Sequence, residues 1–303
     1  MVIPEDSRWL GTINIENDTA WGQKGLTMNL RGQHINVNGI RLHLVIEGSG
    51  PDVILLHGFP DSLQVWRNQI PALVHSGYRV IVPDLRGCGE TDVPVGKTNY
   101  VIDTLIKDVT GMMDNLDIKS ARFIGHDWGA ILGWFVAIEH PERVERYVAI
   151  SVGHPTSYKK GGIEQKLRSW YAFAFQFPYL TEVMTKSFDW WLMRVLTKNH
   201  PEISYWIEDK VRPGRLTAGL NWYRANILRM LFGSTENAKV PVLGIWSSGD
   251  YFLAERQMKQ SALYVDAPWR YERIENSSHW IQLDVPERLN NLLIEYLAQP
   301  MGR

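Results

Sequence analysis

The chain has 303 residues, of which 45% are hydrophobic and 21% are charged, enough apolar sequence for one large core with or without a smaller inserted domain. Its formal net charge of −1 argues against nucleic acid as a partner, and its single cysteine, Cys88, excludes an intrachain disulfide and a multi-cysteine metal site. No apolar leader and no run of about 18 apolar residues occurs, so we expect a cytoplasmic protein with no membrane span.

The first half of the chain alternates short apolar runs with stretches of helical spacing. Residues 1–32 are polar and punctuated by glycine, which predicts an irregular arm. Residues 34–47 contain two alternating segments around Asn38-Gly39, a dipeptide that favours a tight hairpin turn. Further strands are predicted at residues 53–56, 79–82, 122–124 and 144–150, and helical spacing covers residues 62–75 and 100–115. This alternation predicts a mostly parallel sheet with helices on both faces.

The alternation stops after residue 153. Residues 154–235 contain only helical stretches, rich in Trp, Tyr, Phe and Met, and the alternation resumes with predicted strands at 240–246 and 270–274 and a helix at 286–297. We therefore predict a helical cap, residues 154–235, inserted between two segments of one α/β core, residues 33–153 and 236–303. Ligands of such open sheets bind beyond the carboxyl ends of the strands.

A carboxylate stands where one buried strand gives way to a helix. The strand at 122–124 leads into Gly125-His126-Asp127-Trp128-Gly129, and the apolar run that follows opens a helix. The small residues leave room for a tight turn that directs the Asp127 side chain out of the sheet, as in a nucleophile elbow. An aspartate after a strand is also a good N-cap and needs no catalytic role. Other stretches of the chain favour the nucleophile.

An acid and a base follow later strands in the order expected of an α/β-hydrolase fold. Asp250 comes after the strand at 240–246, and His279 comes after the strand at 270–274. The chain order is thus nucleophile, acid and histidine. A lone loop histidine is usually a surface residue, but the matching Asp250 and Asp127 make His279 the predicted base. We predict Asp127, Asp250 and His279 as the catalytic triad.

The loop His57-Gly58-Phe59-Pro60 follows an early strand. In this fold such a loop contributes one backbone N–H to an oxyanion hole, and the residue after the nucleophile contributes another. We therefore predict that the N–H groups of Phe59 and Trp128 form this hole. The alternative is a plain turn with no role in binding.

An aspartate nucleophile determines the chemistry. A carboxylate is anionic at neutral pH without the help of a base, and its attack on a saturated carbon gives an alkyl ester. His279, oriented by Asp250, can then deprotonate a water that hydrolyses the ester, and this scheme needs no cofactor and no metal ion. The substrate should carry a leaving group on carbon. A halide needs only weak N–H donors, whereas the oxygen of an opening epoxide needs a proton or O–H donors.

Phenols that could supply such a proton occur in two stretches of the predicted cap, residues 169–178 and 220–226. Most of the twelve tyrosines of the chain are expected to serve in packing, so the residues alone leave both leaving groups open.

The chain resembles the epoxide hydrolases of the α/β-hydrolase fold over about residues 34–298. The resemblance rests on the motifs quoted above, on Ser248-Gly249-Asp250 and Ser278-His279-Trp280, and on cap segments around Tyr171 and Tyr223. It implies that Tyr171 and Tyr223 hydrogen-bond the epoxide oxygen, and that the partners are a small-molecule epoxide and water. The aromatic content favours an apolar epoxide. The protein is expected to be a monomer or a homodimer.

Two alternatives remain open from the sequence. A haloalkane dehalogenase shares the elbow, and there the indole N–H of Trp128 would bind the halide. A ligand-binding protein on the same scaffold would retain the fold without the chemistry.

Overall fold

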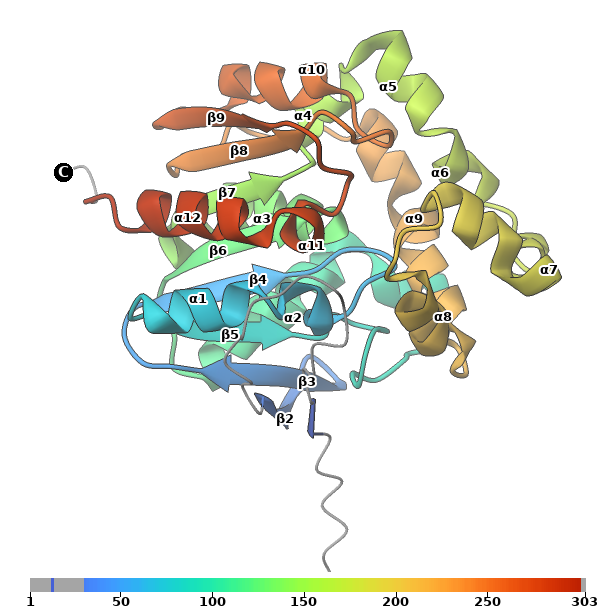
Figure 1. Ribbon diagram of the computed structural model, residues 1–303, viewed down its shortest axis with the longest axis horizontal. Helices are drawn as coiled ribbons and strands as arrows, with labels where there is room; N and C mark the ends of the chain where they lie inside the picture. The colour runs from blue at the N-terminus through green and yellow to red at the C-terminus, as the bar shows by residue number, and fades with distance from the viewer. Residues whose placement is uncertain (1–11, 14–29, 301–303) are drawn as a thin grey trace, which may run out of the picture.

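A central sheet of nine strands organises the structure, a computed structural model that describes residues 12–13 and 30–300. The strand order is β1-β2-β3-β5-β4-β6-β7-β8-β9, and all strands from β5 to β9 in this order run parallel (Figure 1). The strands are β1 (Thr12–Ile13), β2 (Leu30–Val37), β3 (Ile40–Glu47), β4 (Asp52–Leu56), β5 (Arg79–Pro83), β6 (Ala121–His126), β7 (Val144–Ile150), β8 (Val242–Ser247) and β9 (Trp269–Ile274). The predicted α/β-hydrolase fold is confirmed.

The predicted hairpin joins β2 and β3. Asn38 and Gly39 have φ angles of 46° and 76°, and Val37 pairs with Ile40 directly across the turn. The Asn-Gly turn thus has the two positive φ angles that a two-residue hairpin loop requires. Of the predicted arm, residues 1–32, the structure describes only residues 12–13, which pair with β2, and residues 30–32, which begin β2. The rest of that prediction lies outside the described residues.

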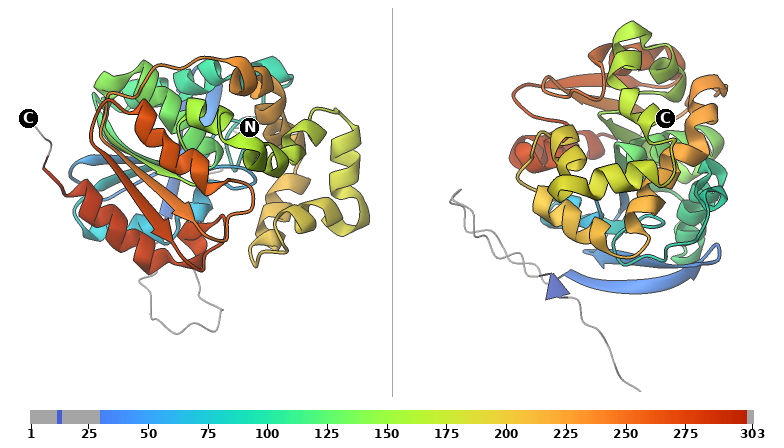
Figure 2. Two further views of the ribbon diagram at one scale, coloured as in Figure 1. Left: turned by 90° about the horizontal axis from the view of Figure 1, so that it is seen from above. Right: turned by 90° about the vertical axis from the view of Figure 1, so that its right-hand side faces the viewer.

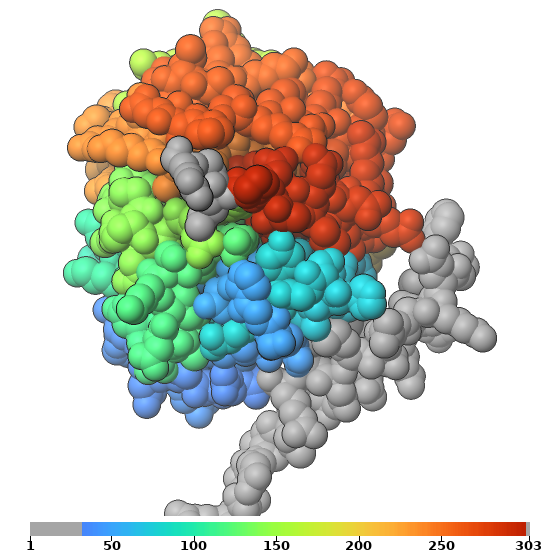
Figure 3. Space-filling model, turned by 90° about the vertical axis from the view of Figure 1, so that its left-hand side faces the viewer, coloured from blue at the N-terminus to red at the C-terminus, as the bar shows by residue number. Residues whose placement is uncertain are grey.

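Helices pack on both faces of the sheet. Helices α1 (Gln69–His75) and α12 (Pro286–Leu297) lie side by side on one face, and α2 (Ile102–Asn115) and α3 (Trp128–Glu139) lie on the other. The pair α1 and α12 is also seen from the side that faces away from the cap (Figure 3). The strands between these layers are continuous apolar runs because both of their faces are buried, as Val53–Leu56 in β4 illustrate.

One predicted helix is interrupted. Helical spacing covers residues 62–75, but the structure has a single 3₁₀ turn, η1 (Leu63–Trp66), followed by the separate helix α1. Pro71 explains the break, because in a continuous helix its ring would clash with the carbonyl of Arg67 and it lacks an N–H to donate.

Residues 154–235, all of which the structure describes, contain six helices and no strand. They are α4 (Pro155–Lys159), α5 (Gly162–Arg168), α6 (Trp170–Ala174), α7 (Leu180–Leu196), α8 (Ile203–Val211) and α9 (Arg215–Phe232). Helices α5 to α9 stand beside the carboxyl ends of the parallel strands, on the right of Figure 1 and facing the viewer in the right-hand panel of Figure 2, whereas α4 lies beside β8. A helix that could cross a membrane is not found in the described part of the chain.

Candidate active site

Asp127 lies at a strained corner between β6 and α3. Its φ and ψ angles are 53° and −121°, a combination that a residue with a side chain rarely adopts. The corner is possible because two glycines allow close backbone approach. A Cβ atom at Gly125 would collide with the carbonyl of Gly129, and one at Gly129 would collide with the carbonyl of Leu56. Asp127 occupies the N-cap position of α3, but its side chain makes no capping hydrogen bond.

The carboxylate of Asp127 instead contacts the loop after β4. The backbone N–H of Phe59 donates to Oδ1 of Asp127 at 2.8 Å. Trp128 is the first residue of α3, so its N–H has no acceptor within the helix. Burial opposes the charge of Asp127, but the neighbouring His279 and the Phe59 N–H outweigh it and hold the pKa of Asp127 below its ordinary value. The carboxylate is therefore ionised at neutral pH.

Asp250 and His279 meet Asp127 from the ends of β8 and β9. His279 Nδ1 lies 2.8 Å from Asp250 Oδ2, and His279 Nε2 lies 3.6 Å from Asp127 Oδ2. The other oxygen of Asp250 accepts the backbone N–H groups of Phe252 and Leu253 at 2.9 and 3.0 Å. Because Asp250 is held at both oxygens, it orients the imidazole ring with Nε2 toward Asp127.

The two carboxylates favour the protonated form of His279. Burial alone would lower the pKa of His279, but the negative charges of Asp250 and Asp127 more than compensate and raise it to about 10. The side chains of Asp127, Asp250 and His279 are all buried. In the free protein they thus form a compact network with one cation between two anions.

Asp61 is a buried residue that our sequence analysis does not single out. Its two oxygens accept the indole N–H groups of Trp206, in cap helix α8, and Trp280, the residue after His279, at 2.7 and 3.2 Å. Burial and the charge of Asp127 raise the pKa of Asp61 to about 7. Asp61 thus connects the cap with the loop of the base. In the sequence, this role of Asp61 is indicated by its position directly after the His57–Pro60 loop.

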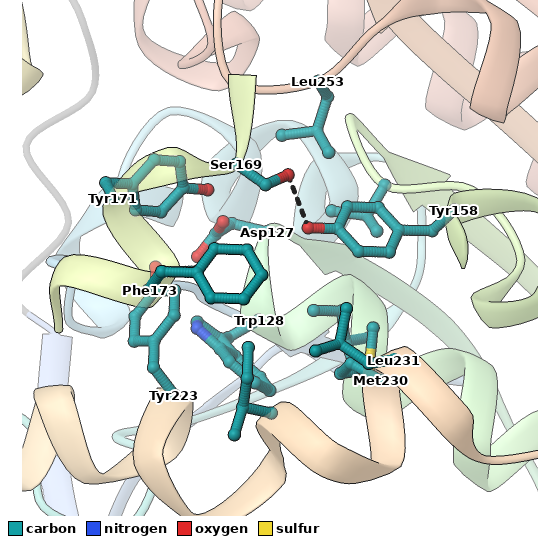
Figure 4. Close-up of a pocket in the computed structure, with 14 residues that line it drawn as sticks. Asp127, Trp128, Tyr158, Ser169, Tyr171, Phe173, Tyr223, Met230, Leu231 and Leu253 are labelled. Carbon is teal, nitrogen blue, oxygen red and sulfur yellow. Dashed lines mark hydrogen bonds between the residues drawn. The ribbon is translucent and has the colours of Figure 1, made fainter. Parts of the chain in front are cut away.

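The predicted cap phenols face the Asp127 carboxylate. Tyr171 in α6 and Tyr223 in α9 both line a cavity that includes Asp127, and their rings are 6.0 Å apart at the centroids. Figure 4 shows the hydroxyl group of Tyr171 close to the carboxylate, with the ring of Tyr223 on the neighbouring side. Burial raises the pKa of each phenol well above its ordinary value. Both hydroxyls are therefore protonated and can donate a hydrogen bond.

Helix α9 is held so that Tyr223 faces the core. The buried Arg224 donates to the carbonyl of Phe175 at 2.8 Å and forms a bidentate ion pair with Glu182 at 2.7 and 2.9 Å. One turn before Tyr223, Gly219 lies against the ring of Phe59, where a Cβ atom would collide with that ring. The Phe59 ring in turn packs edge-on against Tyr223, at 5.8 Å between centroids. The His57–Pro60 loop and helix α9 are thus in direct contact.

Two cavities meet at Asp127, Tyr171 and Tyr223. One has a volume of about 620 Å³, its open mouth included, and extends past Trp128 and Tyr158. The other, of about 400 Å³, contains His279. Tyr158, which the sequence analysis does not single out, also lines the larger cavity, and its hydroxyl is paired with Ser169 at 2.8 Å (Figure 4).

The walls of both cavities are mostly aromatic and aliphatic, so they suit an apolar ligand. Within residues 12–13 and 30–300, no cluster of three or more His, Cys, Asp or Glu could hold a metal ion.

Comparison with known proteins agrees with this geometry. Residues 51–286 match the family model described as alpha/beta hydrolase fold. Human epoxide hydrolase 4 is 33% identical over 283 residues, which cover 88% of this chain and 78% of that protein. The chain belongs to the epoxide hydrolases of the α/β-hydrolase fold. As a member of this epoxide hydrolase family it is a hydrolytic enzyme.

Two further known proteins are similar to this epoxide hydrolase over nearly the same part of the chain. The AB hydrolase superfamily protein YfhM of Bacillus subtilis is 36% identical over 278 residues, which cover 88% of this chain and 97% of that protein. The crystal structure of Bacillus megaterium epoxide hydrolase in complex with an inhibitor matches with a TM-score of 0.81 at 26% identity, covering 88% of this chain and all of that chain. The resemblance proposed from the sequence motifs is confirmed at the level of the family.

Proposed function

We propose that the protein converts an apolar epoxide into a vicinal diol by way of an ester on Asp127. The observation that carries this proposal is the meeting of three groups at one cavity: the ionised carboxylate of Asp127 and the protonated phenols of Tyr171 and Tyr223. A carboxylate can attack a saturated carbon, and phenols can donate to the oxygen that leaves it.

In the first step Oδ2 of Asp127 attacks an epoxide carbon. The new bond joins Oδ2 to this carbon, the C–O bond of the ring breaks, and the released oxygen takes a proton from the phenol of Tyr171 or Tyr223. That phenol regains its proton from the protonated His279, which leaves the imidazole neutral. Oδ1 is the oxygen that accepts the Phe59 N–H, so it becomes the carbonyl oxygen of the ester. The result is an alkyl-enzyme with an alcohol on the adjacent carbon.

In the second step His279 activates water. Its Nε2 faces Asp127, so a water between them can pass a proton to Nε2 and attack Cγ of the ester. The N–H groups of Phe59 and Trp128 stabilise the charge that develops on Oδ1. The bond between Cγ and Oδ2 then breaks, and the leaving oxygen takes the proton from His279. The proton that remains on the new carboxyl group of Asp127 passes to Nε2 of His279, which restores the free enzyme. Asp250 holds the imidazole through Nδ1 during these proton transfers.

Alkylation changes the pKa of His279, and this predicts how the two steps depend on pH. The ester removes the negative charge of Asp127, one of the two charges that raise the pKa of His279 to about 10 in the free enzyme. The pKa of His279 therefore falls on alkylation, and lowering the pH from 8 to 5 reduces the fraction of neutral imidazole that can act as the base. The pKa of Asp127 is lowered, so the nucleophile stays ionised. We therefore expect the ester to accumulate at pH 5, measured by rapid quenching and intact mass spectrometry.

A pH profile in which ring opening slows at pH 5 while no ester accumulates would contradict this assignment of His279.

Removing both phenols is predicted to stop ring opening. The double variant Tyr171→Phe/Tyr223→Phe keeps both buried rings but loses both donors, so diol formation from styrene oxide should fall by at least about 10³-fold, since loss of one donor of this kind costs about 10²–10³-fold. The control is Tyr179→Phe, which removes the hydroxyl of a cap tyrosine that is 84% exposed. Its activity should be unchanged. Near-normal ring opening by the double variant would exclude the proposed role of the phenols.

The two alternatives, a haloalkane dehalogenase and a ligand-binding protein, are distinguished from an epoxide hydrolase by the products that form. A haloalkane dehalogenase would use the indole N–H of Trp128 for a halide, but the nitrogen of this ring lies on the side that faces Tyr223 (Figure 4). We expect diol from styrene oxide and no bromide from a panel of bromoalkanes. Bromide without diol would establish the dehalogenase, and tight binding of apolar ligands without any turnover would favour a ligand-binding protein.

A further inference from the structure

An apolar surface covers the outer side of the cap. Of the seventeen large apolar side chains that are exposed in the described residues, twelve lie between residues 163 and 195. We call the exposed apolar side chains of this segment, which comprises α5, α6 and α7, the cap face. In the right-hand panel of Figure 2 these helices face the viewer, on the side of the molecule away from the sheet. Scattered exposed apolar residues need no explanation, but a concentration of this kind marks an interaction surface.

Helix α7 contributes the most prominent part of the cap face. Phe188 is 89% exposed and lies in a kink of α7, where the backbone of residues 187–190 leaves the helical conformation. Trp191, directly after this kink, is about half exposed. Neither side chain lines a cavity of the active site. An aromatic side chain held outward in this way is suited to insert into an apolar medium outside the protein.

Basic side chains accompany the cap face. Residues 163–195 contain four Lys and Arg against three Asp and Glu, a net charge of +1 in a chain whose total is −1. The three acidic residues are each paired with an arginine. Lys166 and Lys186 are exposed, and neither forms an ion pair with a described residue. The surface therefore combines an apolar area with unneutralised positive charge.

The cap face continues into the active-site cavity. Phe173 is about half exposed on this surface and also lines the cavity of about 620 Å³ that contains Asp127. Trp170, also exposed, lines a groove that reaches Tyr171. A molecule dissolved in an apolar phase against the cap face could thus pass to the carboxylate along apolar side chains.

The positive charge decides between two occupants of this surface. In a two-fold dimer the cap face would meet a second copy of itself, so its positive charges would face one another. The surface of a bilayer with anionic phospholipids presents negative head groups over an apolar interior, and it therefore complements both the lysines and the aromatic side chains.

We propose that the cap face docks on the surface of anionic phospholipid membranes, with Phe188 and Trp191 inserted and Lys166 and Lys186 at the head groups. Docking itself does not depend on the proposed hydrolysis. The supply of epoxides from the bilayer to Asp127, which docking would permit, rests on the proposed function.

Co-sedimentation of the full chain with phosphatidylcholine vesicles, with or without phosphatidylglycerol, tests the proposal without any substrate. We expect binding to the anionic vesicles only, and its loss at about 1 M salt, where the Debye length is about 3 Å. Phe188→Ser/Trp191→Ser should weaken binding at least about tenfold. Lys166→Glu/Lys186→Glu should weaken it at least about 25-fold, since each basic residue near the surface contributes about fivefold.

Matched controls lie on the core. Leu263→Ser removes another exposed apolar side chain and Lys119→Glu reverses another exposed lysine, and both should bind like the wild type. All variants should turn over styrene oxide, which dissolves in water, at the wild-type rate, so loss of folding or of catalysis is recognised separately. Equal binding to both kinds of vesicle, wild-type binding by the cap-face variants, or a dimer that Phe188→Ser dissociates without any vesicle binding would each overturn the proposal.

Discussion

Asp127→Ala should lose diol formation by more than about 10⁴-fold, because no other described side chain in the cavity can take the place of the nucleophile. The two tyrosines and His279 remain in this variant, but without Oδ2 they cannot form the ester. Initial rates with styrene oxide, measured as diol by chromatography, give the effect. A variant that kept more than about one per cent of the wild-type activity would mean that water attacks the epoxide directly.

The loss must be separated from misfolding. Asp127 has a positive φ angle that alanine tolerates no better, and its carboxylate neutralises the buried His279. The variant is therefore compared with Asp266→Ala, which removes an exposed carboxylate of the core. Binding of an apolar ligand to the cavity of Asp127→Ala, followed by the change in tryptophan fluorescence, should persist, since the apolar side chains of the cavity are unchanged.

His279→Gln should stop the reaction half-way. Asp127 remains ionised and the phenols are in place, so the ring opens, but glutamine cannot accept a proton from water. Turnover should fall by more than about 10³-fold, and the enzyme should gain the mass of one substrate molecule. Intact mass spectrometry after incubation with styrene oxide measures the adduct. Peptide mapping should locate it on Asp127.

The double variant Asp127→Ala/His279→Gln is the control for this experiment and should remain unmodified. If His279→Gln binds the substrate but shows no adduct, or if the double variant shows the same adduct, the two-step scheme is wrong.

The framework of the site could be predicted because it depends on strand ends. Asp127, Asp250 and His279 each follow a short apolar run, and parallel strands bring their carboxyl ends to one edge of the sheet. Local patterns therefore predict that these three residues, which are distant in the sequence, lie together. In the structure the imidazole of His279 lies 2.8 Å from the carboxylate of Asp250 and 3.6 Å from that of Asp127. The catalytic roles of these residues stay predictions until the variants are measured.

The orientation of the cap tyrosines could not be predicted from local sequence patterns. Which tyrosines face the carboxylate depends on how α6 and α9 rotate, and that rotation is set by long-range contacts such as those of Arg224 with Glu182 and Phe175. No local pattern distinguishes Tyr223 from a packing tyrosine. Only the resemblance to a family selected Tyr171 and Tyr223. Tyr158 and the connection through Asp61 are further long-range features of this kind.

The interrupted helix has a different cause. Its apolar spacing is compatible with one helix over residues 62–75, but this range contains Pro71. The steric effect of the proline ring on the preceding turn decides the outcome.

The origin of the oxygen in the diol tests the central claim most directly. In a single turnover in water labelled with oxygen-18, with enzyme in excess over styrene oxide, Oδ2 of Asp127 leaves with the product. The account therefore predicts an unlabelled diol and one labelled oxygen on Asp127, read by mass spectrometry of the diol and of the peptide that contains Asp127. A diol labelled in that first turnover, with Asp127 unlabelled, would contradict it.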